Sequence, residues 1–312
     1  MSGVAVLAGG VGAARLLTGM VRAVPPAEVT AIVNVGDDTV LHGLSISPDL
    51  DTVVYTVAGA IDPERGWGLR DESWQAMATL ERYGGLTWFG LGDRDLGTHL
   101  YRTARRAEGA ALSEVTGEIA RAWGLELSVL PVSDDPVRTL LTLASGDEAG
   151  SEVAFQDYFV RLQHSVPVSE VRFSGASSAS PAPGVLAALD AADTVVVAPS
   201  NPIVSIGPVM AVPGVLDVVA ARRTSVVAVS PLVGGRALKG PADRLMRELG
   251  HEDSVVGVAR LYAPHVGTLV IDVADAGLAG AVEAEGLRCV VTDTIMRDPA
   301  AAADLCQVAL GR

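Results

Sequence analysis

Eight short runs of β-branched and aliphatic residues alternate with helical stretches, and this alternation constrains the fold more than any other feature of the chain. The runs are Val4–Leu7, Val29–Val35, Leu86–Leu91, Leu125–Leu130, Thr194–Ala198, Ser225–Ser230, Thr268–Val273 and Arg288–Thr292. Strands that alternate with helices form a parallel sheet covered on both faces. The first run is continuously apolar, as a strand buried on both sides should be. We therefore predict an α/β protein with a Rossmann-like, doubly wound and mostly parallel sheet.

Two segments depart from this scheme. Val137–Leu143 and Glu152–Val160 surround a turn rich in Gly, Asp and Ser, which predicts an antiparallel hairpin. Ser174–Pro183 is a short linker-like stretch that is too brief to mark a domain boundary. We predict one domain over residues 1–312, with an inserted helical and hairpin region at roughly 60–175.

Capping residues predict the ends of two helices. Ser113 is placed to cap a helix through Ala122 that ends before Gly124. Asp298 followed by proline opens a final helix that Gly311 closes.

The charge balance limits the partners. The formal net charge is −14 and Lys239 is the only lysine, which argues against a nucleic-acid surface. A phosphate site in this chain must use backbone amides, arginines or a divalent cation held by carboxylates. Cys289 and Cys306 are too few for a disulfide framework and fit a reducing compartment. With no signal peptide or membrane span in the N-terminal sequence, we expect a cytoplasmic protein without a membrane partner.

A glycine-rich turn lies between the first strand and the first helix. Gly9, Gly10 and Gly12 allow a phosphate to approach the backbone, and the helix N-terminus then offers free N–H groups and a partial positive charge. Tight packing alone also requires glycine at such a turn. The turn is neither a P-loop nor a clean G-x-G-x-x-G motif.

Four carboxylates follow the second strand within a short stretch. Asp37, Asp38, Asp49 and Asp51 come beside the suspected phosphate turn, where a Mg²⁺ ion would neutralise phosphoryl oxygens in a site short of lysine. Aspartates also cap helices and turns, so a structural role is the alternative for each of them.

Two further segments carry candidate binding groups. Arg94 and Arg102 are candidate anion clamps, since a guanidinium can hold phosphate with two hydrogen bonds. His99, at helical spacing from an aspartate, is more often a structural hydrogen-bond partner than a proton donor. Ser200 and Asn201 stand between two prolines directly after a strand, where a stiff loop offers polar groups to a ligand or simply turns the chain.

These segments together resemble the CofD/FbiA family, the transferases that build the deazaflavin coenzyme F-420. The similarity runs in order along nearly the whole chain through LAGGVGAARLL, NVGDD, HGLSISPDLDT, GWGLRDES, WFGLGDRDLGTHLYR, LPVSDDPVRT, VAFQDYFVR, APSNPIVSIGP and AVSPLVGGRALKGPADRLM. The YvcK-like regulatory proteins share the first two motifs but typically continue the second with Gly-Gly-Ser-Ser-Gly. That family, as a nucleotide-sugar-binding regulator, is the alternative. A dinucleotide-dependent oxidoreductase is disfavoured because the chain lacks its fingerprint.

The resemblance implies a Mg²⁺-dependent transferase. In the implied reaction, the terminal ribityl hydroxyl of the deazaflavin Fo would attack the distal phosphoryl group of a guanosine diphosphate ester of a three-carbon acid. GMP would be the leaving group. In the family, methanogen-type members are associated with a 2-phospholactyl donor and actinobacterial members with an enolpyruvyl donor. The scarcity of lysine and the Ala-, Val-, Gly- and Arg-rich composition resemble an actinobacterial sequence, so we expect the enolpyruvyl donor. Members of the family are often dimeric, so we expect a homodimer.

The resemblance also implies roles for single residues. Asp37, Asp51 and Arg94 would be catalytic residues. The metal ion would be bound by Asp37, Asp49 and Asp51. The substrate-binding residues would include Asp49 as well. The full set is Gly9, Gly10, Gly12, Asp38, Asp49, Ser200 and Asn201. Trp67, Trp88 and Tyr158 are candidates for stacking on the deazaflavin ring.

Overall fold

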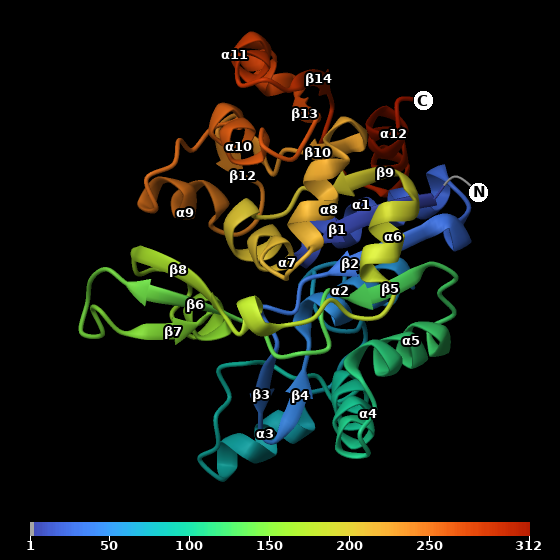
Figure 1. Ribbon diagram of the computed structural model, residues 1–312. Coiled ribbons are helices and arrows are strands. Elements are labelled where there is room, and N and C mark those ends of the chain that lie inside the picture. Colours follow the sequence, from blue (N-terminus) through green and yellow to red (C-terminus); the bar gives the residue numbers. More distant parts are fainter. Residues whose placement is uncertain (1–2) are drawn as a thin grey trace.

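A seven-stranded sheet, in which every strand runs parallel to its neighbours, forms the centre of the molecule (Figure 1). The computed structural model describes residues 3–312. The strands stand in the order β14-β13-β10-β9-β1-β2-β5. Their bounds are β1 (Gly3–Ala8), β2 (Val29–Val33), β5 (Ser128–Pro131), β9 (Ala192–Val197), β10 (Val226–Val229), β13 (Thr268–Asp272) and β14 (Arg288–Thr292). The predicted parallel α/β fold is confirmed.

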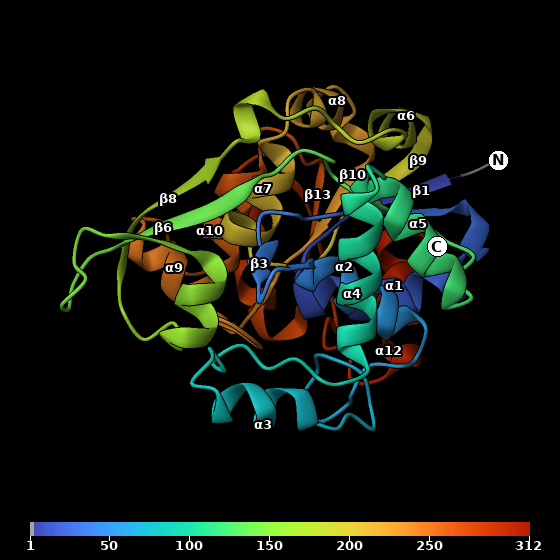
Figure 2. The same cartoon turned by 90° about the horizontal axis from the view of Figure 1, so that it is seen from below.

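Helices cover both faces of this sheet (Figures 1 and 2). One face carries α1 (Gly10–Ala23), packed against α2 (Pro48–Val57) and α12 (Pro299–Ala309), and the other carries α6 (Val185–Ala191) and α8 (Val215–Ala221). The remaining helices are α3 (Gln75–Arg82), α4 (Asp95–Ala107), α5 (Leu112–Ala122), α7 (Gly207–Met210), α9 (Ala242–Glu248), α10 (Val255–Tyr262) and α11 (Ala279–Ala284). The side chain of Asp298 caps α12, as predicted.

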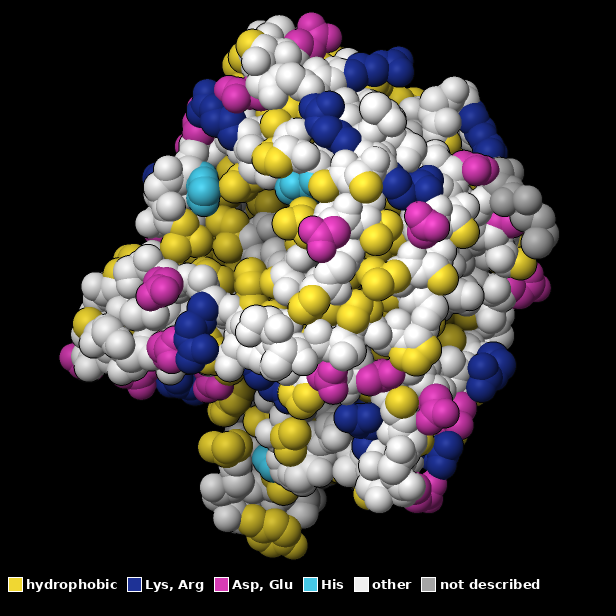
Figure 3. Space-filling model, in the orientation of Figure 1, with side chains coloured by type: hydrophobic (Ala, Val, Ile, Leu, Met, Phe, Trp, Pro, Cys, Tyr) yellow, Lys and Arg dark blue, Asp and Glu magenta, His cyan; other side chains and the backbone are white. Residues whose placement is uncertain are grey.

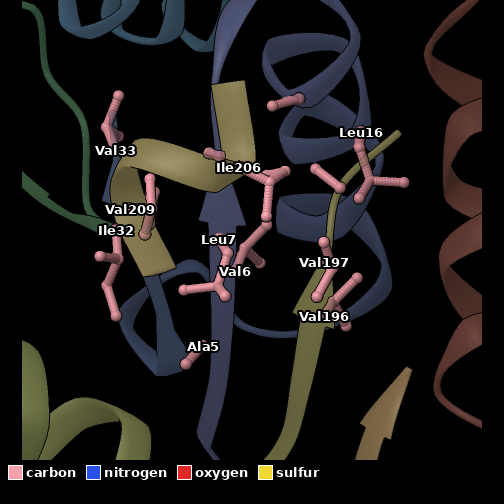
Figure 4. Packing of buried hydrophobic residues seen from close by; sticks show 14 of the residues in the cluster. Ala5, Val6, Leu7, Leu16, Ile32, Val33, Val196, Val197, Ile206 and Val209 are labelled. Carbon is pink, nitrogen blue, oxygen red and sulfur yellow. The ribbon is translucent and has the colours of Figure 1, made fainter. Parts of the chain in front are cut away.

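The core lies between the sheet and these helices. β1 is apolar along its length because both of its faces are covered, and Leu7 in it is fully buried. Figure 4 shows Ile206 and Val209, which follow β9, packed with the side chains of the central strands. The loop after β9 is therefore anchored in the core and holds its polar residues in a fixed place.

Three small antiparallel sheets are separate from the main sheet. They are the hairpin of β3 (Thr39–Leu41) and β4 (Leu44–Ile46), the three-stranded sheet β7-β6-β8, and the short hairpin of β11 (Leu232–Val233) and β12 (Arg236–Ala237). The predicted hairpin is confirmed as β6 (Arg138–Leu143) and β7 (Glu152–Ala154). Its second strand ends earlier than predicted, and a π-helical turn, Asp157–Arg161, follows. The sheet gains a third strand, β8 (Val168–Ser174), that the sequence pattern did not predict.

Two local predictions were wrong. Leu86–Leu91 forms no strand because it runs between α3 and α4 without a neighbouring strand to pair with, although Leu91 is buried under Met77 and Ile46. Ser113 does not cap α5, which begins one residue earlier, at Leu112, after Ala111. Its hydroxyl donates instead to Asp134, 2.9 Å away.

Two separate segments leave the main sheet on its β2 side. The range 60–175, predicted as an insertion, contains β5, which pairs with β2 in the main sheet. The chain thus leaves the sheet between β2 and β5 to form β3, β4 and α2–α5, and again after β5 to form β6–β8. Among residues 3–312, no single helix is long and apolar enough to cross a membrane.

Candidate functional site

The strand order reverses its direction between β1 and β9. From β1 the chain proceeds outward to β2 and β5, then returns to β9 and proceeds the opposite way to β10, β13 and β14. Ligands of open α/β sheets bind at such a switch point, outside the carboxyl ends of the strands. The glycine turn follows β1 and the Ser200-Asn201 loop follows β9, and the Ser200 hydroxyl donates to the Gly9 carbonyl, 2.7 Å away. The structure therefore brings these two predicted motifs together.

Each glycine of the turn has a packing reason to be glycine. Gly10 has a φ of +71°, in the left-handed region that favours glycine. A Cβ on Gly12 would lie 2.2 Å from the Pro199 carbonyl oxygen, and one on Gly9 would lie 2.8 Å from the Ser205 Cβ. The turn thus allows the loop after β9 to approach α1 closely. Its phosphate-binding role stays a prediction.

The carboxylate of Asp49 lies at the N-terminus of α1, where the phosphate was predicted. Its Oδ2 accepts the Asn34 amide at 3.0 Å, and a Cβ on Gly10 would lie 3.9 Å from its Oδ1. Burial raises the pKa of Asp49 to about 6, against the opposing hydrogen bonds from Asn34 and the Gly10 N–H. Free N–H groups at a helix N-terminus favour an anion. A donor phosphate at this point would therefore share the turn with Asp49.

Asp37 is buried beside Asp49, whereas Asp38 is half-buried on the side of Arg102 and Arg138, and each has an oxygen without a partner in residues 3–312. The Oδ1 atoms of both side chains have no hydrogen-bond partner among the described residues. Burial, and then the charge of Asp49, holds the pKa of Asp37 well above its ordinary value. Burial likewise raises the pKa of Asp38 to about 7, although the Ser47 hydroxyl donates to its Oδ2 at 2.8 Å. Buried carboxylates resist ionisation unless a cation compensates their charge, and at Asp38 the charges of Arg102 and Arg138 oppose the rise in pKa.

These carboxylates suit a magnesium ion whose coordination shell also includes oxygen atoms of a substrate. Within residues 3–312, no group of three or more His, Cys, Asp or Glu side chains is arranged to hold a metal ion alone. Mg²⁺ is usually held by one or two carboxylates, with substrate phosphates and water completing an octahedron. Asp37 and Asp49 supply such a pair, with one unpartnered oxygen on Asp37.

Asp51 is engaged elsewhere. Arg102 of α4 contacts both of its carboxylate oxygens, with 3.1 Å between Arg102 Nη1 and Asp51 Oδ2. His99 Nε2 lies 3.3 Å from Asp95 Oδ2, and the Tyr55 hydroxyl donates to Asp95 Oδ1 at 2.7 Å. His99 thus contacts Asp95, as their helical spacing predicted, and its chemical role stays a prediction. Asp51 and Arg102 form a buried ion pair between α2 and α4, so neither is free to hold a ligand in this arrangement.

The remaining candidates lie in two different settings. Arg94 is exposed at the start of α4, and its guanidinium donates to the Arg70 carbonyl at 2.6 Å. Asn201 Oδ1 accepts the N–H groups of Ile203 and Val204, at 2.9 and 3.3 Å, and so caps the π-helical turn Pro202–Ile206. Its Nδ2 is buried and has no partner within the described part of the chain. Asn201 therefore has one donor group left for a ligand, whereas Arg94 is not part of the carboxylate cluster.

The aromatic candidates are similarly divided. Tyr158 is buried with its hydroxyl against Arg244, whereas Trp67 is 43% exposed and packs edge to face on Trp74.

Sequence reasoning missed two contributors. Asn34 holds Asp49 through its amide and, through its Oδ1, accepts the Gly36 N–H at 2.7 Å. A small cavity of about 80 Å³ next to Asp38 is lined by charged groups from Arg102, Arg138 and Asp134, among others. The signal for Asn34 was its place directly after β2, at the same sheet edge as the glycine turn. Arg138 and Asp134 lie in the LPVSDDPVRT segment, to which the residues alone assign no chemistry.

Fold and site together define a doubly wound α/β protein with a buried carboxylate cluster at its switch point. The sequence model of the family described as "2-phospho-L-lactate transferase CofD" matches residues 4–307. The chain belongs to this CofD family of transferases, whose reaction is a step in F-420 biosynthesis.

Curated relatives agree with this family. The chain is 44% identical over 308 residues to the phosphoenolpyruvate transferase of Kitasatospora aureofaciens, covering 97% of this chain and 95% of the relative. It is 44% identical to that of Streptomyces griseus and 39% identical to that of Mycobacterium avium, covering 98% of this chain and 97% of each relative. A solved structure of a upf0052 family protein from Bacillus halodurans shares the fold, with a TM-score of 0.62 over 99% of this chain and 100% of the other. The sequence identity there is 18%, so this likeness concerns the fold alone.

Proposed function

We propose that this protein transfers a phosphoenolpyruvyl group from a guanosine diphosphate ester to the deazaflavin Fo, with release of GMP. The observation that carries the proposal is the pair of buried carboxylates Asp37 and Asp49 beside the glycine turn at the switch point, with one oxygen of Asp37 left without a partner among the described residues. The relatives named phosphoenolpyruvate transferase support the enolpyruvyl donor over the 2-phospholactyl one.

Phosphoryl transfer depends mainly on positioning and on compensation of charge. In the proposal the donor phosphates lie at the N-terminus of α1, between Gly10 and Ser200. The residues that would hold Mg²⁺ are Asp37 and Asp49, and the ion would supply positive charge to the phosphoryl oxygens. The raised pKa of Asp38, about 7, also lets that carboxyl accept a proton from an acceptor hydroxyl near neutral pH.

The test is an assay with Fo and each of the two guanylyl donors in the presence of Mg²⁺. We expect GMP release that requires Fo, and a product mass that corresponds to the enolpyruvyl transfer. No turnover with either donor, in protein shown to be folded by circular dichroism, would reject the proposal.

A further inference from the structure

The side chain of Asn34 links the two carboxylates that are candidates for Mg²⁺. Its Nδ2 donates to Asp49 Oδ2 at 3.0 Å, and the same side chain also hydrogen-bonds Asp37. Asn34 is fully buried and lies directly after β2, so it reaches both the turn that carries Asp37 and the first turn of α2 that carries Asp49. A neutral amide therefore stands at the centre of this acidic pair.

The backbone fixes which end of the amide faces the carboxylates. Asn34 Oδ1 accepts the Gly36 N–H at 2.7 Å, and a backbone N–H can only donate. Gly36 is itself held, because its carbonyl oxygen accepts the N–H of Thr139 in β6 at 2.8 Å. A flipped amide would set two donors against each other at Gly36 and two acceptors against each other at Asp49. The NH₂ group of Asn34 must therefore face the carboxylates.

This orientation limits what the protein alone offers to a cation. An amide NH₂ group is a donor, whereas Mg²⁺ takes oxygen ligands in an octahedral shell. The NH₂ group of Asn34 also engages Oδ2 of Asp49. That leaves Oδ1 of Asp49 and Oδ1 of Asp37, which has no partner within the described residues. One oxygen from each carboxylate fills only a small part of an octahedral shell.

The neighbouring carboxylates are associated with arginines. Arg102 forms an ion pair with Asp51, and the charges of Arg102 and Arg138 act on Asp38. At the surface, acidic and basic side chains lie interspersed on the face of the molecule that Figure 3 shows. A cation at Asp37 and Asp49 must therefore obtain its remaining ligands from water and from a bound substrate.

We propose that Asn34 makes the binding of Mg²⁺ depend on the donor substrate. An amide stands where a third carboxylate would strengthen the metal site, so the protein alone holds the ion weakly, and the diphosphate of the donor supplies the missing oxygens. Asn34 is a positioning residue in this role, because it acts on the ion through Asp49 and Asp37. This inference rests on the proposed function, which supplies both the metal and the diphosphate.

The experiment measures the binding of Mn²⁺, with and without GDP. Mn²⁺ replaces Mg²⁺ because electron paramagnetic resonance counts the free ion. Wild-type protein should bind Mn²⁺ at least about tenfold more tightly with GDP than without it, after correction for the Mn²⁺ that GDP binds in solution. Asn34→Asp supplies a third carboxylate, so without GDP it should bind Mn²⁺ at least about tenfold more tightly than wild type. The effect of GDP on this variant should fall below about threefold.

Two further variants serve as controls. Asn201→Asp adds the same charge to the loop after β9 and keeps the cap, because an aspartate oxygen still accepts the N–H groups of Ile203 and Val204. Its affinity for Mn²⁺ without GDP should stay within about twofold of wild type. Asn34→Leu keeps the branched shape but donates no hydrogen bond to Asp49, so its affinity for Mn²⁺ in the presence of GDP should fall by at least about tenfold.

Two results would overturn the inference. Equal Mn²⁺ affinity of wild-type protein with and without GDP would show that the protein completes the site alone. An Asn34→Asp variant that gains no more affinity than Asn201→Asp would show that Asn34 does not set the dependence. If circular dichroism shows that Asn34→Asp does not fold, wild-type Mn²⁺ affinity in Asn34→Leu leads to the same conclusion. Wild-type protein that binds GDP but no Mn²⁺ is a different outcome, because it would reject the metal site of the proposed function and the inference with it.

Discussion

Asp49 and Asp51 stand two residues apart in the first turn of α2 and have opposite surroundings. Residues at this spacing point about 200° apart around a helix, so they cannot share a site on one face. Asp49 faces the glycine turn, where burial raises its pKa and Asn34 and the Gly10 N–H, both uncharged, are the hydrogen-bond partners. Asp51 faces α4, where it forms an ion pair with Arg102.

The difference predicts that Asp49 contacts a ligand, whereas Asp51 holds two helices together. A buried ion pair satisfies its own charge and belongs to the architecture. A buried carboxylate cluster without a counter-ion lowers the stability of the ligand-free protein. Groups of this kind are concentrated at functional sites. Four experiments test this division, ordered by the size of the expected effect.

The first experiment tests the buried ion pair of Asp51 and Arg102. Arg102→Met leaves Asp51 buried without its counter-ion, and we expect a loss of about 3–5 kcal/mol in the free energy of unfolding. Urea denaturation measures this loss. The double variant Arg102→Met with Asp51→Leu removes both charges and should recover most of the stability. No recovery would mean that Arg102 acts through other contacts.

The second experiment addresses the cluster itself. Asp37→Asn should lower turnover by at least about tenfold, because one lost carboxylate leaves the phosphoryl charge less well compensated. The same variant should be at least as stable as wild type without Mg²⁺, since it removes a repulsive buried charge. Turnover at limiting Mg²⁺ and the melting temperature are measured together. Wild-type turnover would remove Asp37 from the site.

The third experiment uses pH. The pKa values of Asp38 and Asp49 are raised to about 7 and about 6, so the protonated forms stabilise the fold at low pH. This stabilisation is complete below the ordinary value of 3.8 and is lost as the pH rises through 6 to 7. Mg²⁺ should therefore raise the melting temperature by a few degrees at about pH 8 and hardly at all at about pH 5. An equal rise at both pH values, or the same rise in Asp37→Asn, would contradict this cluster as the metal site.

The smallest effect concerns the turn. Gly10→Ala places a side chain at a φ of +71°, which costs about 1 kcal/mol of stability. Gly43→Ala is the matched control, because Gly43 has a φ of +77° and a Cβ added there would meet no atom within 4 Å. Both variants should lose similar stability in thermal melts, but only Gly10→Ala should weaken GDP binding in calorimetry. Equal GDP affinity in both would show that the turn only packs.

The sequence by itself determined the fold class and the edge of the sheet that carries the site. Alternating apolar runs specify a parallel sheet, and the carboxyl ends of parallel strands meet at one edge, so Gly9, Asn34 and Ser200 had to lie there. Leu86–Leu91 shows the limit of this reasoning, because an apolar run becomes a strand only where a partner strand is available.

Only the tertiary structure decided which carboxylates act together. Asp37, Asp49 and Asp51 are equivalent in the sequence pattern, but the side on which α4 packs gives Asp51 a guanidinium and leaves Asp37 and Asp49 without one. Charge compensation and strand pairing depend on partners far apart in the chain, and local sequence does not record which partners meet.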